Sequence, residues 1–260
     1  MSGPALRVEG LTVSYGGVLA VDGVSLTVER GEVVGLIGPN GAGKTSFIDA
    51  VTGFTAARGT VRVDDTALDG MPAHRRARAG LGRTFQSVEL FDDLTVEENL
   101  RVAASDPRWW SPLLDAVRPR DRHAADVAWA LDAVGLADAA AEMPTELPTG
   151  RTRLVGVARA LVRRPAVLLL DEPAAGLDTT ESAALGRRIR AIASSGVAVL
   201  LVDHDMSLVL SACDRVAVLD FGALIATGPP TAIREDPRVI AAYLGTGAAA
   251  AAPVDTEAAP

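Results

Sequence analysis

The 260-residue chain contains one cysteine, few aromatic residues and no long apolar run. Because Cys213 stands alone, the chain can form neither an internal disulfide nor a cysteine-based metal cluster. Aromatic residues are only 4% of the chain, so alanine, valine and leucine must fill most of the core. The longest aliphatic runs, Val167–Leu170 and Val197–Val202, are far shorter than the roughly 20 residues that span a bilayer. The first residues include no apolar stretch like that of a secretion signal. We expect a soluble chain whose membrane role, if any, comes through partners.

Positive charge is also in deficit. The 25 basic residues face 33 acidic ones, for a net charge of −8, which argues against a protein that coats nucleic acid. Hydrophobic residues at 48% and charged residues at 22% are typical of a globular chain. At about 150 residues per domain, the length predicts one large domain or two small ones.

Lysine is almost missing, since 24 of the 25 basic residues are arginine and Lys44 is the single exception. An ammonium is a compact charge on a flexible stem, whereas guanidinium is a planar fork. A lysine that persists where arginine serves every other position indicates a role that arginine cannot fill.

Strands and helices alternate at both ends of the chain. The first part predicts strands, then a glycine-rich loop at 38–43, then a helix over Lys44–Thr52 that ends at Gly53. After Pro165 buried strands alternate with helices again, and a hairpin turns at Phe221 and Gly222. The expected strands and helices of these two parts are Leu6–Tyr15, Val24–Val28, Glu32–Ile37, Val61–Val63, Val167–Leu170, Thr180–Ser194, Val197–Val202, Met206–Ala212, Arg215–Asp220 and Ala223–Thr227.

The middle of the chain, about 87–160, is helix-rich. Thr95 and Glu98 form a capping box that starts a helix reaching about Ala104. An irregular stretch over 106–122 follows, and then come helices over Asp121–Val134 and Thr149–Arg163. The sequence predicts an α/β core interrupted by a helical insertion.

The segment Gly38-Pro-Asn-Gly-Ala-Gly-Lys-Thr45 fits the pattern G-x-x-x-x-G-K-[ST] between a buried strand and a helix. Its glycines let backbone N–H groups converge on phosphate oxygens at a helix N-terminus. Lys44 is expected to reach the β- and γ-phosphates of a nucleotide, and Thr45 to hold Mg²⁺. An ordinary glycine-rich turn is the alternative, but it leaves the sole lysine unexplained.

A buried strand, Val167–Leu170, delivers Asp171 and Glu172 at its carboxyl end. Ligands of open α/β sheets bind at that edge. We expect Asp171 to hold Mg²⁺ and Glu172 to orient the attacking water, against the alternative of a solvated acidic turn.

With further motifs in order, residues 6–245 resemble an ATP-binding subunit of an ABC transporter. Asp178 resembles that family's D-loop aspartate, His204 its switch histidine, Gln86 its Q-loop glutamine and Tyr15 its adenine-stacking aromatic residue. The resemblance implies a P-loop NTPase (RecA-like) core with an antiparallel β subdomain and a helical insertion subdomain at about 87–160. This domain covers 1–245, and a disordered tail covers 246–260.

The resemblance implies these roles for the residues. The catalytic residues are Glu172, His204 and Gln86, and the Mg²⁺ ligands are Thr45, Gln86 and Asp171. The residues expected to contact ATP are Tyr15, Gly38, Pro39, Asn40, Gly41, Ala42, Gly43, Lys44, Thr45, Ser46, Asp178 and Gly150. Ordinary structural roles remain open for Tyr15, as a strand aromatic, and for His204, at a strand end.

The family's signature, usually Leu-Ser-Gly-Gly-Gln, is here Leu147-Pro-Thr-Gly-Arg151. In the family this segment reaches across a dimer to the γ-phosphate held by the other subunit. Pro148 removes the serine hydroxyl and one N–H donor, while Thr149 and Arg151 can compensate in part. We therefore expect an asymmetric heterodimer with one fast and one slow site. The alternative is that Pro148 is tolerated and both sites hydrolyse ATP.

Gly82–Leu100, Asp171–Asp178, His204–Leu210 and Asp236–Gly245 resemble the branched-chain amino acid importer subgroup. The implied partners are membrane permeases, a second and distinct ATP-binding subunit, indirectly an extracytoplasmic solute-binding protein, and no nucleic acid. The implied place is the cytoplasmic face of the membrane, as a peripheral subunit. The alternatives are a soluble ABC ATPase acting on ribosomes or DNA, and an ATPase for lipid or lipopolysaccharide export.

Two surfaces are expected near Gln86. The apolar residues Val88, Leu90 and Phe91 either form the docking surface for the permease or belong to the core of the insertion. The arginines at 75, 76, 78 and 83 are expected to form a solvated or lipid-facing helix.

Overall fold

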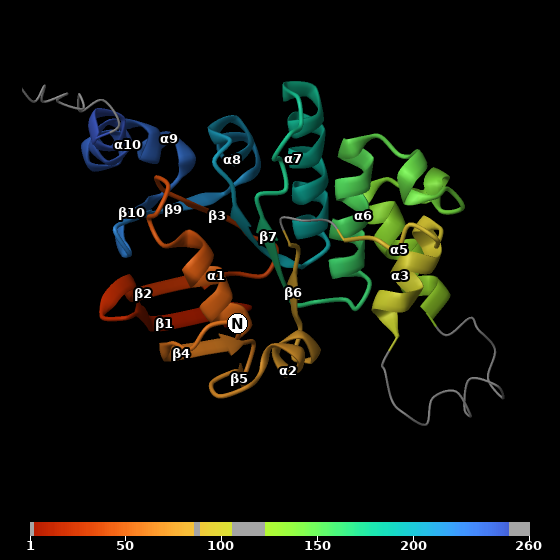
Figure 1. Cartoon of the computed structure of the whole chain (residues 1–260), viewed down its shortest axis with the longest axis horizontal. Helices are drawn as coiled ribbons and strands as arrows, with labels where there is room; N and C mark the ends of the chain where they lie inside the picture. Colours follow the sequence, from red (N-terminus) through yellow and green to blue (C-terminus); the bar gives the residue numbers. More distant parts are fainter. Residues whose placement is uncertain (1–2, 86–88, 106–122, 250–260) are drawn as a thin grey trace, which may run out of the picture.

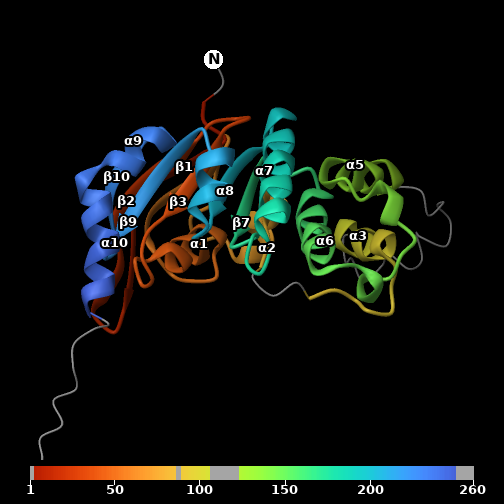
Figure 2. The same ribbon diagram turned by 90° about the horizontal axis from the view of Figure 1, so that it is seen from above.

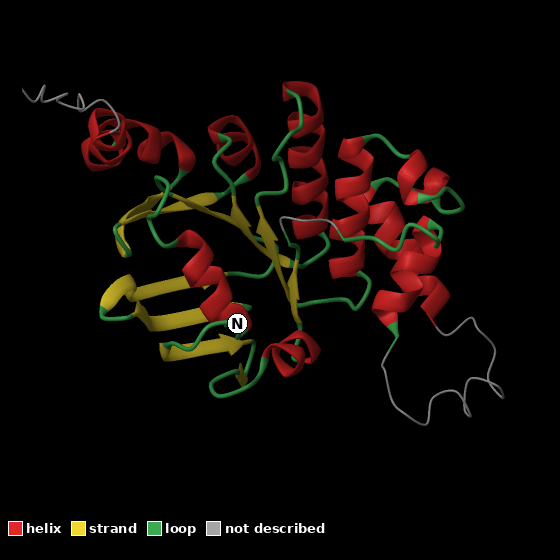
Figure 3. Cartoon of the chain, viewed as in Figure 1, coloured by secondary structure: helices red, strands yellow, loops and turns green. Residues whose placement is uncertain are grey.

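The computed structural model describes residues 3–85, 89–105 and 123–249, with the side chains of 244–249 excepted. Two sheets and a group of helices make up the described chain (Figure 1). Figure 3 shows the strands gathered at one end and a purely helical part at the other. This arrangement confirms the expected α/β fold class.

The larger sheet has six strands in the order β10-β9-β3-β8-β7-β6. The five strands from β9 to β6 are parallel, and β10 closes an antiparallel hairpin with β9. The inner strands are apolar throughout because helices or the second sheet cover both faces. The strands are β3 (Val33–Ile37), β6 (Leu81–Arg83), β7 (Val167–Asp171), β8 (Ala198–Val202), β9 (Arg215–Asp220) and β10 (Ala223–Gly228).

The smaller sheet is antiparallel, in the order β2-β1-β4-β5, and encloses one hydrophobic core together with the larger sheet. Helix α1 (Lys44–Thr52) places Phe47 and Ile48 in this core. The strands are β1 (Leu6–Tyr15), β2 (Val18–Val28), β4 (Arg58–Val63) and β5 (Thr66–Ala67), and the short helix α2 (Ala73–Arg78) follows them.

A second core lies on the opposite face of the larger sheet. Along β7, Leu168 and Leu170 point into this core, whereas Val167 and Leu169 point into the first one. Figure 2 shows the helices that cover this face and those of the insertion in a row. They are α3 (Val96–Ala104), α5 (Ala124–Val134), α6 (Thr149–Leu161), α7 (Thr179–Ser194) and α8 (Met206–Ala212), with the 3₁₀ turns η2 (Ala137–Ala139) and η3 (Pro144–Glu146).

Helices α9 (Pro230–Glu235) and α10 (Pro237–Ala249) close the described chain. Helix α10 runs four residues past the boundary expected at 245, and the rest of the expected tail lies outside the described residues. The expected irregular stretch 106–122 lies outside them too.

Candidate nucleotide-binding site

The phosphate loop, residues 38–43, connects β3 to α1 and needs glycine where the chain turns most tightly. Gly38 and Gly43 have φ angles of 153° and 102°. A Cβ on Gly38 would lie 2.2 Å from the carbonyl oxygen of Leu219, and one on Gly43 would lie 2.2 Å from that of Ala20. Within the loop, Asn40 and Gly41 are exposed. The backbone therefore approaches its neighbours and any ligand more closely than other residues would permit.

Lys44 lies at the first turn of α1 and folds back over the loop. Its Nζ donates to the carbonyl oxygens of Gly38 (2.6 Å) and Pro39 (3.0 Å). Burial lowers the pKa of Lys44, and the charges of Glu172 and then Asp171 act in the opposite direction. The ammonium thus sits between the loop and the acidic end of β7, where a phosphate would lie.

Asp171 ends β7 beside β8, in register with Val202, and Glu172 follows directly. Asp171 is 6% exposed, and burial raises its pKa while the hydrogen bond and charge of Arg83 oppose the rise. Glu172 has a φ of 46°, a strained angle for a residue other than glycine, and its N–H donates to the Val202 oxygen at 2.7 Å. Such strain is characteristic of residues that a functional site holds in place.

His204 follows β8 and faces the same acidic end. Its Nδ1 lies 3.9 Å from Glu172 Oε1 and 3.8 Å from Asp203 Oδ1, and its side chain is 64% exposed. The structure therefore brings the phosphate loop, Asp171, Glu172 and His204 to one edge of the sheet.

Asp203 was not predicted as part of this site. It is 1% exposed and accepts N–H bonds from Ala174 (3.1 Å) and Asp205 (2.9 Å). The carboxylate thus fixes the loop after Glu172 against the loop that carries His204. The sequence feature that could have identified Asp203 is its position, as a charged residue immediately after a buried strand.

The structure does not bring the other predicted residues together with this group. Tyr15 ends β1 half exposed, with its hydroxyl 3.3 Å from Thr55 Oγ1. Asp178 caps α7 by accepting the N–H groups of Thr180 and Glu181, each at 2.8 Å. Gly150 lies in the first turn of α6, and helix α6 is separate from α1 in both Figures 1 and 2. Gln86 lies outside the described residues.

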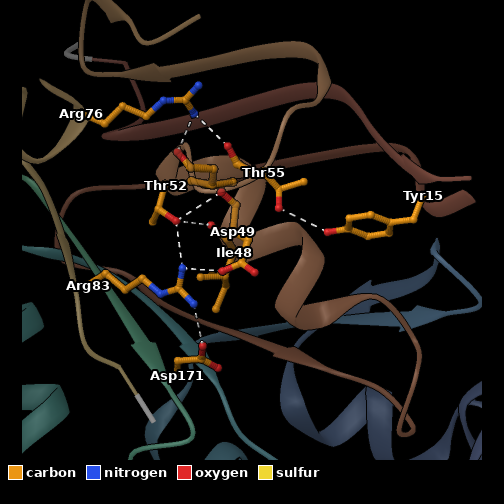
Figure 4. A network of polar contacts seen from close by, with 10 residues as sticks. Tyr15, Ile48, Asp49, Thr52, Thr55, Arg76, Arg83 and Asp171 are labelled. Carbon is orange, nitrogen blue, oxygen red and sulfur yellow. Dashed lines mark hydrogen bonds and ion pairs between the residues drawn. The ribbon is translucent and has the colours of Figure 1, made fainter. Parts of the chain in front are cut away.

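Two of the four arginines expected on a solvated or lipid-facing helix are buried, and that expectation was wrong for them. Arg76 is 9% exposed and donates to the carbonyl oxygens of Ala50 and Val51, both at 2.8 Å. Arg83 is in strand β6, and its side chain is 10% exposed. Figure 4 shows both guanidinium groups beside α1 and its C-terminal end. Carbonyl and carboxylate oxygens within the protein hold these two cations, so neither serves as a solvated or lipid-facing surface charge.

A hollow of about 660 Å³ opens between the larger sheet and the helical part. Phe85, Leu90, Phe91 and Pro173 line it, together with Arg83 and Asp171 from the nucleotide site. Phe91 is 44% exposed, whereas Leu90 is partly buried against the core. Of the predicted docking residues, Val88 lies outside the described residues.

The segment Leu147–Arg151 starts helix α6. Pro148 occupies the N-cap position and supplies no side-chain cap. Arg151 donates to Asp138 Oδ1 at 2.6 Å, a pair in which the carboxylate is 71% exposed. The cation expected to compensate for the missing serine is thus paired within its own subdomain.

A lysine-bearing phosphate loop and an acidic strand end, joined on a mostly parallel sheet, define the class of P-loop nucleotide hydrolases. Residues 21–175 match the family model described as ABC transporter, and residues 223–249 match that described as branched-chain amino acid ATP-binding cassette transporter. The chain belongs to the ABC transporter ATP-binding family, and it is an ATPase that drives transport.

Known relatives are similar over nearly their full length. The high-affinity branched-chain amino acid transport ATP-binding protein BraF of Pseudomonas aeruginosa is 44% identical over 254 residues, covering 94% of this chain and 99% of BraF. LivG of Escherichia coli, which carries the same description, is 42% identical with the same coverage. The lipopolysaccharide export system ATP-binding protein LptB of Escherichia coli is 38% identical over 92% of this chain and 97% of LptB.

Solved structures agree with the fold. A nucleotide-free ATP-binding cassette from an ABC transporter superposes with a TM-score of 0.81 at 27% identity, covering 93% of this chain and 99% of the other. The ADP conformation of such a cassette gives the same TM-score and identity, with 94% and 100% coverage. Among the described residues, no helix combines the length and apolar character needed to cross a bilayer.

Proposed function

We propose that this chain is the ATP-hydrolysing subunit of an importer for branched-chain amino acids or related small polar solutes. The main support is the 44% identity to BraF over almost the whole of both chains. The match of residues 223–249 to the branched-chain amino acid transporter model adds independent support from the C-terminal segment. Identity is lower, at 38%, to the lipopolysaccharide export protein LptB, which favours the amino acid group.

Mg-ATP is the proposed cofactor. Tyr15 stacks on the adenine, residues Gly38–Ser46 and Lys44 in particular bind the phosphates, and Asp178 and Gly150 contact nucleotide in the assembled dimer. The oxygen donors Thr45, Asp171 and Gln86 suit the hard Mg²⁺ ion, which is bound by few protein ligands together with nucleotide phosphates.

In the proposed hydrolysis step, Thr45, Asp171 and Gln86 would hold the Mg²⁺ ion, which would supply positive charge beside the phosphates. Glu172 orients and deprotonates the attacking water, because it follows Asp171 directly and its charge acts on Lys44 of the phosphate loop motif. His204, whose Nδ1 is 3.9 Å from Glu172 Oε1, holds that carboxylate and the transferred phosphate in line. Gln86, which resembles the family's Q-loop glutamine, is proposed as a further catalytic residue.

The proposed partners are integral membrane permeases, which dock in the 660 Å³ hollow. Leu90, Phe91 and Phe85 offer apolar contact there, and Arg83 and Asp171 lie at its nucleotide end. We propose that the subunit works at the cytoplasmic face of the membrane as a peripheral component. The solute-binding protein acts through the permeases, and no nucleic acid takes part.

A second ATP-binding subunit, a distinct chain, completes the proposed pair. Helix α6 lies away from α1 in two perpendicular views, so the Leu147–Arg151 segment serves a nucleotide bound by another chain (Figures 1 and 2). Since Pro148 lacks the hydroxyl and the N–H donor, the site that includes this segment is the slower one.

The test is purification of the tagged Glu172→Gln variant from native cells in detergent with Mg-ATP. This change keeps the side-chain shape and removes the base, so ATP binds and is not hydrolysed. A matched Lys44→Ala variant, which loses phosphate binding, is purified in parallel. Mass spectrometry identifies the proteins that co-purify.

We expect multi-span permeases and a second ATPase with Glu172→Gln, and much less of the second ATPase with Lys44→Ala. Cells that lack the gene should take up less labelled leucine than wild-type cells. The wild-type gene should restore this uptake, whereas the genes for the two variants should not. Recovery of ribosomal or DNA-bound proteins without permeases would contradict the proposal.

A further inference from the structure

Arg83 lies at the end of β6 with its guanidinium between two parts of the nucleotide site. Its Nη1 donates to Asp49 Oδ1 (2.6 Å) and Thr52 Oγ1 (3.0 Å), both on α1. Its Nη2 donates to Asp171 Oδ2 (3.1 Å) at the end of β7. One side chain therefore links the helix that follows the phosphate loop to the carboxylate proposed to bind Mg²⁺ (Figure 4).

Aromatic rings hold the guanidinium in this position. Its Cζ lies 5.5 Å from the centre of the Phe54 ring and 5.1 Å from that of Phe85, and the two rings pack edge to face. The Nε atom is buried without a hydrogen-bond partner within the described ranges of the chain. Burying a donor without a partner is unfavourable, so the other contacts of Arg83 must be strong enough to fix its orientation.

We propose that Arg83 is a positioning residue for the metal-binding carboxylate of Asp171. This inference rests on the proposed metal role of Asp171. A partner that orients a metal ligand commonly sets metal affinity by about 10- to 100-fold without touching the metal. Because a carboxylate has two oxygens, Oδ2 can accept from Arg83 while Oδ1 remains available as a metal ligand.

Through helix α1, the contacts of Arg83 affect both proposed metal ligands. The proposed metal ligand Thr45 lies one helical turn before Asp49. Arg83 binds Asp49 and Asp171 together, and the Asp171 N–H also donates to Thr84 Oγ1 at 3.2 Å. The separation of the two proposed metal ligands, on α1 and β7, is thus set through Arg83.

Lysine cannot replace this arginine, because the contact uses two nitrogens of a planar fork. An ammonium reaching Asp171 would leave Asp49 and Thr52 without their shared donor. Arg83→Lys is therefore expected to keep the charge and lose the positioning, which separates geometry from electrostatics.

The experiment measures metal and nucleotide binding separately in the full chain, with Glu172→Gln in every variant to prevent hydrolysis. Mn²⁺ binding to the ATP complex is followed by electron paramagnetic resonance, and metal-free binding of a fluorescent ATP analogue is titrated in EDTA. The variants are Arg83→Gln, Arg83→Lys and Asp171→Asn. Arg30→Gln, which breaks an exposed pair with Asp64, is the control for loss of an arginine.

Arg83→Gln and Arg83→Lys are expected to raise the Mn²⁺ dissociation constant about 10- to 100-fold, while metal-free ATP binding stays within about twofold. Unchanged Mn²⁺ affinity, tighter Mn²⁺ binding or an equal loss of both affinities would overturn the inference. If Asp171→Asn leaves Mn²⁺ affinity unchanged, the proposed metal role of Asp171 fails instead.

Should the Arg83 variants not fold, Phe85→Leu provides a second test, because it removes an exposed ring from beside the guanidinium. This change is expected to weaken Mn²⁺ binding severalfold, and no change would refute the proposal.

Discussion

Tyr15 is a half-exposed aromatic side chain at the end of β1, held by one contact to Thr55. We predict that Tyr15→Ala weakens ATP binding about 5- to 150-fold, because stacking of a base on a ring contributes about 1–3 kcal/mol. Tyr15→Phe keeps the ring, loses the contact to Thr55 and should bind ATP nearly as the wild type does. Fluorescence titration with an ATP analogue measures both, and equal affinity for the alanine variant would assign Tyr15 to the sheet alone.

Residues also differ in how clearly their roles could be predicted. Lys44 and the glycines of the phosphate loop are recognisable because residue type and spacing carry the chemistry. Arg76, Arg83 and Asp203 are not, because their roles depend on partners 25 to 88 positions away or in a neighbouring loop. From the sequence alone an arginine is expected at the surface. Only the structure shows the oxygen atoms that surround a buried one.

Helix α1 is the element on which the nucleotide site depends, and Arg76 satisfies its last carbonyl groups. We predict that Arg76→Met destabilises the fold by about 2–3 kcal/mol, because two buried carbonyl oxygens lose a charged donor. Urea denaturation followed by circular dichroism measures the loss. Arg75→Met changes the exposed neighbouring residue of the same helix and should leave the midpoint almost unchanged. An equal effect of both changes would refute the capping role.

Elements with strong local signals were predicted to the residue. Helix α1 has the expected bounds, and so does α3, whose Thr95 and Glu98 form the predicted capping box. Strand β6 was not predicted, since three residues carry too little periodicity, and the helix expected to carry the arginines at 75, 76, 78 and 83 ends at Arg78 in α2, before Arg83. Pairing of β6 with β7 defines that strand, and this pairing spans more than 80 positions of the chain.

At the scale of the assembled transporter, the departure at Leu147–Arg151 predicts unequal sites. We predict that restoring Pro148→Ser together with Arg151→Gln raises ATP turnover of the complex several-fold, up to about tenfold, by supplying a hydrogen bond to a charged phosphate. Pro148 is exposed and Arg151 is partly exposed, and solvent screens the Arg151–Asp138 pair, so both changes are expected to leave the fold intact.

Steady-state ATPase assays of the purified complex provide the measurement. The single change Arg151→Gln is the control, since it breaks the pair with Asp138 and restores no hydroxyl. Unchanged turnover in the double variant would show that Pro148 is tolerated and that both sites already hydrolyse ATP.

The sequence by itself determined the phosphate loop, the acidic strand end and the alternation of strands and helices, because each is encoded in contiguous residues. It also determined the order of motifs on which the family resemblance rests. These features depend on local conformation and on burial patterns with short periods, which a single stretch of chain contains in full.

Only the tertiary structure decided which polar groups are buried together. It placed Arg83 between α1 and Asp171, put Asp203 under the loop of His204, and opened the hollow beside Phe91. The physical reason is that the energy of a charged group depends on the partners and the solvent around it. Folding brings those partners from distant parts of the chain, and their identities cannot be inferred from the residue alone.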